Sequence, residues 1–329
     1  HPDAEGAERV HRLQIELGGR FLEADLLRLR VAPRYTVYFV VRDEFFDRRG
    51  AYGASGRDYD DNAERFVFFS KAVAEAMRLA DLKADIVHAH DWQTALLPVY
   101  VRLVEERHDT SLAVKTVFTV HNLSFQGVFP MDAFALTNLP EEFRSVDGLE
   151  FFGQLNLMKA GLLFGDRLTT VSPTYAREIQ SPEYGCGLEG VIATRAADLV
   201  GLLNGVDEAV WNPATDVLLP ARYTADDPAG KAKCRRALLK KCGFDAETKV
   251  PIFAMITRLT EQKGIDLLLS ARRFFETEDC RLIIVGVGQS RYEEALQDLA
   301  QANPRRVALA KMLDEPMTHL VEAGADFFL

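Results

Sequence analysis

The sequence predicts an α/β protein made of two doubly wound domains, each built around a parallel sheet. Short apolar runs alternate with amphipathic helical patterns over residues 85–203, and the same alternation returns over residues 251–329. Between the two series lies the stretch 206–247, which is rich in proline, charge and short breaks. We therefore expect domains at residues 1–205 and 206–329.

The opening segment predicts antiparallel structure instead. Apolar alternation over Leu13–Leu17 and Leu22–Val31, separated by Gly18-Gly19, is typical of a hairpin. The run Tyr35–Val41 (YTVYFVV) predicts a buried strand. An amphipathic helix follows, with Asp61 or Asn62 as its cap. The buried face of this helix would carry Phe66, Phe69, Val73 and Met77.

The remaining elements follow from the hydrophobic period and from turn residues. In the first domain we expect strands at residues 85–90, 115–121, 167–171 and 199–203, and helices at residues 95–106 and 154–164. A further helix begins at Ser172-Pro173, because serine caps a helix and proline suits its first turn. In the second domain we expect strands at residues 251–257, 281–287, 307–311 and from 326 onward, and helices at residues 264–275, 292–302 and 317–323.

The composition disfavours several classes of function. A formal net charge of -10, spread along 329 residues, is unsuited to binding nucleic acid or an anionic membrane surface. No apolar stretch is long enough to predict a membrane span. The four cysteines show no CxxC pair and no metal-site spacing. We therefore expect reduced thiols in a cytoplasm, or in a plastid if the source is a plant. Nothing in the residues predicts an oligomeric state.

Residues that directly follow a strand are the candidates for a site, because ligands of open parallel sheets bind outside the carboxyl ends of the strands. The stretch His88-Ala89-His90-Asp91-Trp92 ends the strand 85–90 with two imidazoles, a carboxylate and an indole. Two histidines two residues apart point to one face and could bind a metal ion, with His121 as a further ligand. Polar groups that tie a loop together are the structural alternative. We prefer a site without metal.

Two further strand ends in the first domain carry polar residues. The strand 115–121 ends at His121 and is followed by Asn122, and two polar strand ends in neighbouring βα units favour a shared cleft. Asn204-Gly205 follows the strand 199–203. An Asn-Gly pair is first of all a turn signal, and the functional alternative has Asn204 facing the cleft.

The loop Thr257–Gly264 (TRLTEQKG) follows the first strand of the second domain and leads into a helix. Arg258 and Lys263 flank it. A planar guanidinium and a point charge near a helix N-terminus suit a diphosphate. A solvated charged loop is the structural alternative.

Two glycine loops remain. Gly286-Val287-Gly288 could begin an NAD-binding fingerprint, but no third glycine follows in place. We expect instead that Gly288 lets a ligand approach the backbone. The loop Tyr184–Gly190 predicts either a turn or a backbone anion nest near the substrate, centred on Gly187.

Taken in order, these motifs resemble those of bacterial glycogen synthases and plant-type starch synthases, the retaining glucosyltransferases of family 5 with the two-domain GT-B fold. The resemblance covers residues 35–329. It rests on HAHDWQ, TVHNLSFQG, LMKAG, TTVSPTYAREIQSPEYGCGLEG, GLLNGVDEAVWNP and TRLTEQKGIDLL. The strings SPTYARE and NGVDEAVWNP are far more specific than a GxG. The resemblance implies two Rossmann-like domains that face a cleft.

The resemblance implies transfer of glucose from ADP-glucose or UDP-glucose to the nonreducing end of an α-1,4-glucan, without metal or cofactor. Arg258 and Lys263 would bind the diphosphate and stabilise the charge of the leaving nucleotide. His121 would lie beside the donor glucose, and Asp91 would line the same pocket. Retention would come from attack on the same face, with the leaving phosphate helping to deprotonate the acceptor.

The resemblance also implies a wider set of substrate contacts. Residues 1–205 would form the acceptor side of the cleft, and residues 206–329 the nucleotide-sugar side. Trp92 would lie on the acceptor side and Tyr52 in the cleft, while Asn204 would touch the ligand from the hinge. The predicted substrate-binding residues are Trp92, Asn122, Asn204, Tyr52, Gly187 and Gly288.

The sequence also departs from the family pattern. It lacks the N-terminal lysine-glycine-glycine loop and the C-terminal two-glutamate motif, and Leu313 stands where many relatives carry an aromatic residue near the base. The start at His1 and the apolar end 326–329 are typical of a fragment truncated at both ends. We expect little or no transferase activity from these residues alone. An inactive glucan-binding or regulatory relative, an NAD enzyme and a metal hydrolase are the alternatives.

Overall fold

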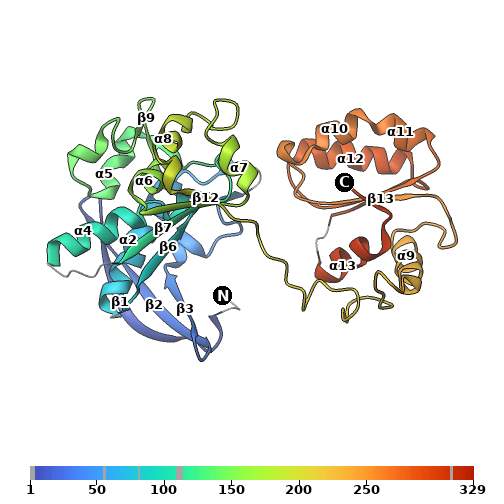
Figure 1. The fold of residues 1–329 in the computed structure, drawn as a ribbon, viewed down its shortest axis with the longest axis horizontal. Coiled ribbons are helices and arrows are strands. Elements are labelled where there is room, and N and C mark those ends of the chain that lie inside the picture. Colours follow the sequence, from blue (N-terminus) through green and yellow to red (C-terminus); the bar gives the residue numbers. More distant parts are fainter. Residues whose placement is uncertain (1–3, 55–56, 81, 109–113, 312–313) are drawn as a thin grey trace. The chain divides into compact units, whose positions relative to one another are not determined.

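The computed structural model describes residues 4–54, 57–80, 82–108, 114–311 and 314–329. They form two compact units, His1–Asn204 and Gly205–Leu329, each with its own sheets and core (Figure 1). No helix in the described part of the chain is long and apolar enough to cross a bilayer. Leu313, at the position of the family's aromatic residue, lies outside the described residues.

A parallel sheet lies at the centre of the first unit, as predicted. Its order is β12-β11-β7-β6, and every neighbouring pair is parallel. Its strands are β6 (Ile86–His90), β7 (Lys115–Val120), β11 (Arg167–Thr170) and β12 (Leu199–Gly201). The helices between and beside them are α3 (Asp91–Thr94), α4 (Leu97–His108), α6 (Leu157–Phe164), α7 (Pro173–Glu178) and α8 (Glu189–Thr194). Because all four strands run in one direction, their carboxyl ends lie at the same edge.

The predicted hairpin is confirmed as part of an antiparallel sheet. Its order is β1-β2-β3, with β1 (Glu8–Leu17), β2 (Arg20–Ala32) and β3 (Tyr35–Val41). The prediction of a buried strand at Tyr35–Val41 was wrong, since every residue of β3 is exposed or only half-buried. The physical reason is its place at the edge of the sheet, where β2 is its one hydrogen-bonded neighbour among the described strands.

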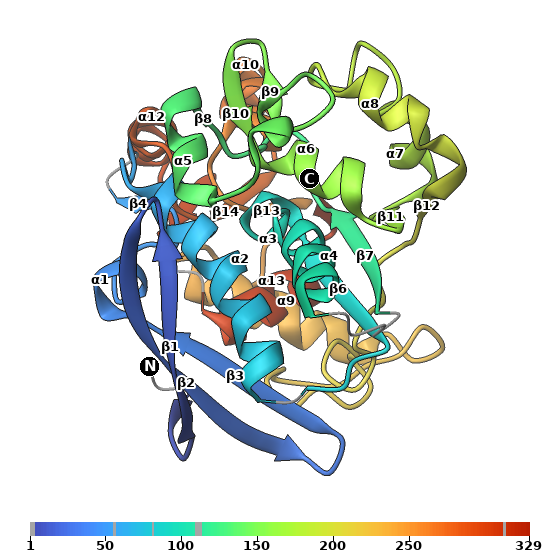
Figure 2. The same cartoon turned by 90° about the vertical axis from the view of Figure 1, so that its left-hand side faces the viewer.

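Helix α2 (Asn62–Leu79) packs across the antiparallel sheet, as Figure 2 shows. The predicted apolar face is only partly correct, because Phe69, Val73 and Met77 are half-buried. The helix contacts β1, α4 and α5 (Phe134–Thr137), so several of its faces are covered. Its buried apolar residues are therefore spread around the helix: Ala63, Phe66, Val67, Phe68, Ala72, Ala74 and Ala76.

The residues expected to cap α2 have other partners. Asp61 is the N-cap residue of α2, as predicted, but its side chain makes no capping hydrogen bond. The Asp61 carboxylate accepts two hydrogen bonds from the Arg48 guanidinium, at 2.7 and 2.6 Å. The Asn62 amide donates to the Tyr52 carbonyl at 2.8 Å. The start of α2 therefore fixes the preceding loop, which includes α1 (Asp43–Phe46), β4 (Gly53–Ala54) and β5 (Arg57–Asp58).

The helix predicted at residues 154–164 begins three residues later. Gln154–Asn156 forms strand β10, which pairs with β8 (Val128–Pro130) and β9 (Glu150–Phe151). The Asn156 side chain then accepts a hydrogen bond from the Lys159 amide at 3.1 Å and so caps α6. Tertiary strand pairing outweighs the helical period here. Short 3₁₀ turns complete the unit at η2 (Met131–Ala133), η3 (Glu141–Arg144) and η4 (Ala196–Asp198).

The second unit is also built around a parallel sheet, with the order β15-β14-β13-β16. Its strands are β13 (Ile252–Ile256), β14 (Arg281–Val285), β15 (Val307–Ala310) and β16 (Phe327–Phe328). Alternate residues of β14 belong to different cores: Ile283 packs with residues of α9 and α13, and Ile284 with residues of α10 and α12. Both faces of the sheet are therefore covered, as predicted.

Two helix predictions in the second unit need correction. Residues 264–275 form two helices, α10 (Ile265–Ser270) and α11 (Arg272–Thr277), after the 3₁₀ turn η5 (Glu261–Lys263). The connecting stretch 206–247 contains a further helix, α9 (Ala229–Lys241). Its apolar signal is weak, because its buried residues are only Cys234, Leu238 and Leu239. The remaining helices are α12 (Ser290–Ala302) and α13 (Glu315–Gly324).

The NGVDEAVWNP motif contacts α13 through an aromatic stack between a partly exposed tryptophan and a buried histidine. The Trp211 indole stacks on the His319 imidazole, with ring centroids 3.9 Å apart and an interplanar angle of 13°. The Nδ1 atom of His319 lies 2.6 Å from the Asp216 carboxylate. A turn stabilised by Asp207, whose carboxylate accepts from the Ala209 amide at 3.0 Å, precedes the tryptophan. Trp211 and Asp207 of this motif therefore have structural roles.

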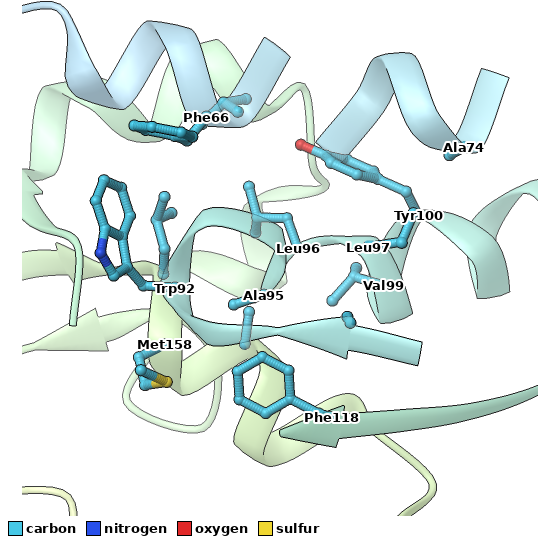
Figure 3. Packing of buried hydrophobic residues seen from close by; sticks show 14 of the residues in the cluster. Phe66, Ala74, Trp92, Ala95, Leu96, Leu97, Val99, Tyr100, Phe118 and Met158 are labelled. Carbon is cyan, nitrogen blue, oxygen red and sulfur yellow. The ribbon is translucent and has the colours of Figure 1, made fainter. Parts of the chain in front are cut away.

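The core of the first unit is close-packed around β7, and Figure 3 draws part of it, including Trp92, Phe118 and Met158. Phe118 is fully buried. A Cβ atom on Gly161 in α6 would lie 2.4 Å from the Phe118 Cζ atom. The glycine of the LMKAG motif is therefore required by the ring beneath it.

We expect Gly161→Ala to lower the free energy of unfolding by about 1–3 kcal/mol, because the enclosed Phe118 ring has no room to move. Gly190→Ala in α8 is the matched control, since nothing lies within 4 Å of the added Cβ. The control should be neutral or stabilising by up to about 1 kcal/mol. Chemical denaturation of both variants measures the difference. Equal stability of the two variants would contradict the packing argument.

Candidate functional site

Polar residues from two neighbouring strands meet at the carboxyl edge of the first unit's sheet. Asp91 directly follows β6, and His121 directly follows β7. The His121 amide donates to the Asp91 carboxylate at 2.7 Å. The His90 Nδ1 atom lies 3.0 Å from the His121 Nε2 atom, within hydrogen-bond distance. The structure thus brings together two of the predicted catalytic residues, Asp91 and His121.

Asp91 adopts a left-handed backbone conformation with φ 55°. This conformation is uncommon outside glycine, although aspartate tolerates it better than most residues. It turns the chain from β6 into α3 within one residue. The Thr94 hydroxyl secures the turn, because it accepts from the His90 amide at 2.6 Å and lies 2.7 Å from the His90 carbonyl. Such local strain is a common feature of functional sites.

Three imidazoles form a row along this edge. The ring centroids of His88 and His90 are 4.1 Å apart, and those of His90 and His121 are 5.3 Å apart. Desolvation lowers the pKa of His88, and the charge of His121 lowers it further. The pKa of His90 is also lowered, chiefly by desolvation and then by His88 and His121, against the opposite effect of Asp91. Both imidazoles are therefore mainly neutral at pH 7.

One ring nitrogen of each of these histidines has a hydrogen-bonding partner within the protein. The His88 Nε2 atom lies 2.6 Å from the Thr119 hydroxyl, and the His90 and His121 nitrogens face each other. Over the described residues, no group of three or more His, Cys, Asp or Glu side chains is arranged to hold a metal ion. The histidine pair that suggested a metal therefore belongs to a hydrogen-bonded row.

An aromatic cluster lies beside this row. The Trp92 ring is 8% exposed, and its centroid lies 4.7 Å from that of Phe66 and 5.8 Å from that of Phe129. The Tyr52 ring, 47% exposed, lies 6.2 Å from the Trp92 ring. Trp92 thus packs behind a more accessible tyrosine. A direct contact between Trp92 and an acceptor stays a prediction.

The loop after β7 is held by the SPTYARE motif. As predicted, the Ser172 side chain caps α7, accepting from the Tyr175 amide at 2.8 Å. The Tyr175 hydroxyl accepts from the Leu123 amide at 3.0 Å, and burial raises the pKa of this phenol. The Asn122 side chain accepts from the Ser124 amide at 3.0 Å. Tyr175, which the sequence did not single out, therefore positions the loop that carries His121 and Asn122.

The loop around Gly187 joins the same system. Gly187 has φ 84°, and a Cβ atom there would lie 2.9 Å from the Phe151 Cζ atom. The Gln126 amide donates to the Cys186 carbonyl at 3.0 Å. Gln126 in turn accepts from Asn156 at 2.6 Å. These contacts connect the loop of Gly187 to the loop after β7.

Asn204 is the last residue of the first unit and follows β12. The Leu202 amide donates to the Thr170 carbonyl at 2.7 Å, so the chain continues in the direction of the strand. The Asn204 side chain is exposed. It therefore leaves the sheet at the same carboxyl edge as Asp91 and His121.

In the second unit, Arg258 and Lys263 lie in the loop that follows β13. The chain proceeds from β13 to β14 and β15 on one side, whereas β16 pairs with the other side of β13. The loop therefore borders the switch point of the sheet, where doubly wound folds bind ligands. Both side chains are exposed, and no ion pair joins either of them to another described residue. The acid between them, Glu261, is 3.2 Å from Arg291.

Gly288 follows β14 and lies against this loop. A Cβ atom on Gly288 would lie 2.3 Å from the Leu259 carbonyl oxygen. The Gly288 amide donates to the Glu293 carboxylate at 2.8 Å. Position 288 therefore requires glycine because the backbone of Leu259 lies so close to it, whether or not a ligand binds there. A ligand contact at Gly288 stays a prediction.

The structure adds His90 to the residues predicted for the site. Its ring lies between those of His88 and His121, and it belongs to the HAHDW motif. The spacing of two residues along β6 places His88 and His90 on one face, so the signal was present in the sequence. The pairing of β6 with β7 supplies the third ring.

Comparison with known proteins assigns this chain to a family. The family model described as "Starch synthase catalytic domain" matches residues 2–194. The glycogen synthase of Opitutus terrae is 56% identical over 329 residues, which is 100% of this chain and 68% of that protein. The glycogen synthase of Anaeromyxobacter sp. is 46% identical over 297 residues, or 90% of this chain and 62% of that protein.

A solved structure agrees with these matches. The catalytic domain of Starch Synthase IV from Arabidopsis thaliana, bound to ADP and acarbose, superposes with a TM-score of 0.88 at 29% identity. The match covers 98% of this chain and 66% of that one, so the chain spans about two thirds of the length of its relatives. The predicted pair of doubly wound domains in the GT-B class is confirmed. The chain belongs to the starch synthase catalytic domain family.

Proposed function

We propose that this chain supplies the donor and acceptor sites of a retaining glucosyltransferase. The enzyme moves glucose from a nucleoside diphosphate glucose to the nonreducing end of an α-1,4-glucan. The observation that carries the proposal is a pair of exposed cations beside the switch point of the second unit, Arg258 and Lys263, which have no ion-pair partner among the described residues. The relatives are named as synthases, which favours an enzyme over an inactive glucan-binding relative.

The donor diphosphate would bind to Arg258 and Lys263. A guanidinium and an ammonium group together neutralise the charge that grows on the nucleotide as it leaves. The Glu261–Arg291 ion pair keeps the neighbouring carboxylate from competing for these cations. The Gly288 backbone, beside the same loop, would line this part of the site. Because the Arabidopsis relative was solved with ADP, ADP-glucose is the favoured donor over UDP-glucose.

The glucose and the acceptor would bind at the edge of the first unit. Asp91, His121 and Asn122 offer directional partners for sugar hydroxyls, with His121 beside the donor glucose. Tyr52 and Trp92 would form the acceptor side, with Asn204 and the Gly187 backbone completing the contacts. The departing phosphate would accept the acceptor's proton on the same face, which gives retention. Transfer requires both sets of residues to act on one pair of substrates, and that juxtaposition stays a prediction.

The reaction is tested with labelled donors and the gene product that contains these residues. We expect label from ADP-glucose to enter glycogen, at a rate well above that from UDP-glucose. No incorporation from either donor, with the protein shown to be folded, would reject the proposed activity. Faster incorporation from UDP-glucose would reject only the choice of nucleotide.

We expect Arg258→Ala and Lys263→Ala each to weaken ADP binding by roughly tenfold to a hundredfold, since each removes a charged hydrogen-bond donor to the diphosphate. Arg305→Ala is the matched control. Arg305 is also exposed, but it lies in the turn before β15, at the amino edge of the same sheet. Calorimetric titration with ADP measures all three variants. Equal losses in Arg258→Ala and Arg305→Ala would point to long-range charge rather than a site.

We expect the imidazoles of His88 and His90 to titrate below the ordinary histidine pKa of 6.5. As the pH falls below 6.5, the unfolded chain binds protons before these folded imidazoles do, so their contribution lowers the free energy of unfolding. In each neutral ring one nitrogen, Nε2 of His88 and Nδ1 of His90, lies within hydrogen-bond distance of a protein atom, which leaves the other nitrogen for a sugar hydroxyl. NMR titration of labelled histidine measures both pKa values. His121→Asn should raise both, and unchanged values would show that His121 does not act on them.

A further inference from the structure

Phe152 is the most exposed aromatic residue of the described chain, with 81% of its surface in contact with solvent. It stands at the tip of the hairpin formed by β9 and β10. The Phe151 ring contacts it edge to face, at a centroid distance of 4.7 Å, and supports one side of it. A single exposed apolar residue is common on protein surfaces, so a binding role for Phe152 depends on what surrounds it.

The turn that carries Phe152 is an unfavourable place for a bulky residue. Phe151 pairs with Gln154, so Phe152 and Gly153 alone form the turn, with φ 49° and 80°. Two-residue turns with both φ values positive prefer Asn-Gly. An asparagine would thus suit the backbone of position 152 better than phenylalanine does. Position 152 therefore carries an exposed phenylalanine although the turn conformation favours asparagine there.

The tip of this hairpin adjoins the loops of the candidate site. A Cβ atom on Gly187 would lie 3.4 Å from the Phe152 Cε2 atom. The residue before Gly187, Cys186, accepts the hydrogen bond from Gln126. Gln126 belongs to the loop that begins with His121 and Asn122. Phe152 is therefore connected to the site through two successive contacts within the first unit.

The same two loops each expose another aromatic residue. Phe125, next to Gln126, is 53% exposed, and Tyr184, before Cys186, is 46% exposed. Three segments connected by these contacts thus each present an aromatic side chain to solvent. Aromatic faces pack against the C–H faces of pyranose rings, while the hydroxyls of the sugar remain in water. An uncharged glucan chain matches this surface better than an ionic ligand does.

We infer that Phe152, with Phe125 and Tyr184, forms a platform for the α-glucan acceptor chain beyond the reacting sugar. The inference rests on the proposed function and extends it to further glucose units of the acceptor. A longer acceptor gains contacts on this platform that a short one lacks. The platform therefore raises affinity for oligosaccharides and leaves binding of the nucleotide unchanged.

The test is Phe152→Asn, which removes the ring and places a residue preferred by the turn. We expect maltoheptaose to bind the full chain more weakly by roughly three- to tenfold, the range for loss of one aromatic contact. Phe152→Trp should retain the affinity. Phe21→Asn is the matched control, because Phe21 is 64% exposed at the start of β2 in the antiparallel sheet. Calorimetry with maltoheptaose and with ADP, and light scattering, measure each variant.

Wild-type affinity for maltoheptaose in Phe152→Asn, or an equal loss in Phe21→Asn, would overturn the platform. A change from dimer to monomer in Phe152→Asn would assign the ring to contact with a second copy and would also overturn it. If the wild-type chain binds ADP but not maltoheptaose, the platform fails and the donor site stands. If it binds neither, the proposed function itself fails.

Discussion

Burial of one face of the first parallel sheet and of both faces of the second is the constraint on which the candidate site depends. In β14, neighbouring residues such as Ile283 and Ile284 pack into separate cores on opposite faces. In β7, Phe118 and Val120 are fully buried. The face of the first sheet that carries Phe118 and Val120 is therefore closed to a polar ligand, whereas on the opposite face β6 exposes Ile86, His88 and His90. The carboxyl edge collects the residues that follow each strand, whatever their separation in the chain.

The residues at that edge are held in place by others that need not touch a substrate. Tyr175 fixes the loop after β7 through the Leu123 amide, and Thr94 fixes the turn after β6. Asn156 caps α6 and also binds Gln126, so one side chain connects a helix start to a site loop. Long motifs such as SPTYARE are accordingly explained in part by support of the site. Asp91 belongs to both groups: its left-handed backbone forms the turn after β6, and its carboxylate is one of the candidate site groups.

The two edges differ in charge in a way that suits the two parts of a nucleotide sugar. The first unit presents the imidazoles of His88 and His90, whose lowered pKa values favour the neutral form, and neutral imidazoles suit hydroxyl groups. The second presents Arg258 and Lys263, which suit an anion. The family assignment and this contrast in charge point to the same reaction, although each comes from a separate observation.

The sequence by itself determined the two parallel sheets, because buried strands and amphipathic helices have distinct periods. It also made Asp91, His121, Arg258 and Lys263 candidates for the site, because each lies at the end of a predicted strand or in the loop that follows one. Only the tertiary structure decided the features that depend on neighbours: the exposed edge strand β3, the several buried faces of α2, and the strand β10 within a helical pattern. The contacts of His90 with His121 and of Tyr175 with Leu123 belong to the same class. Each of these features is determined by residues distant in the chain, and the periodicity of a local segment does not indicate which distant residues it will contact.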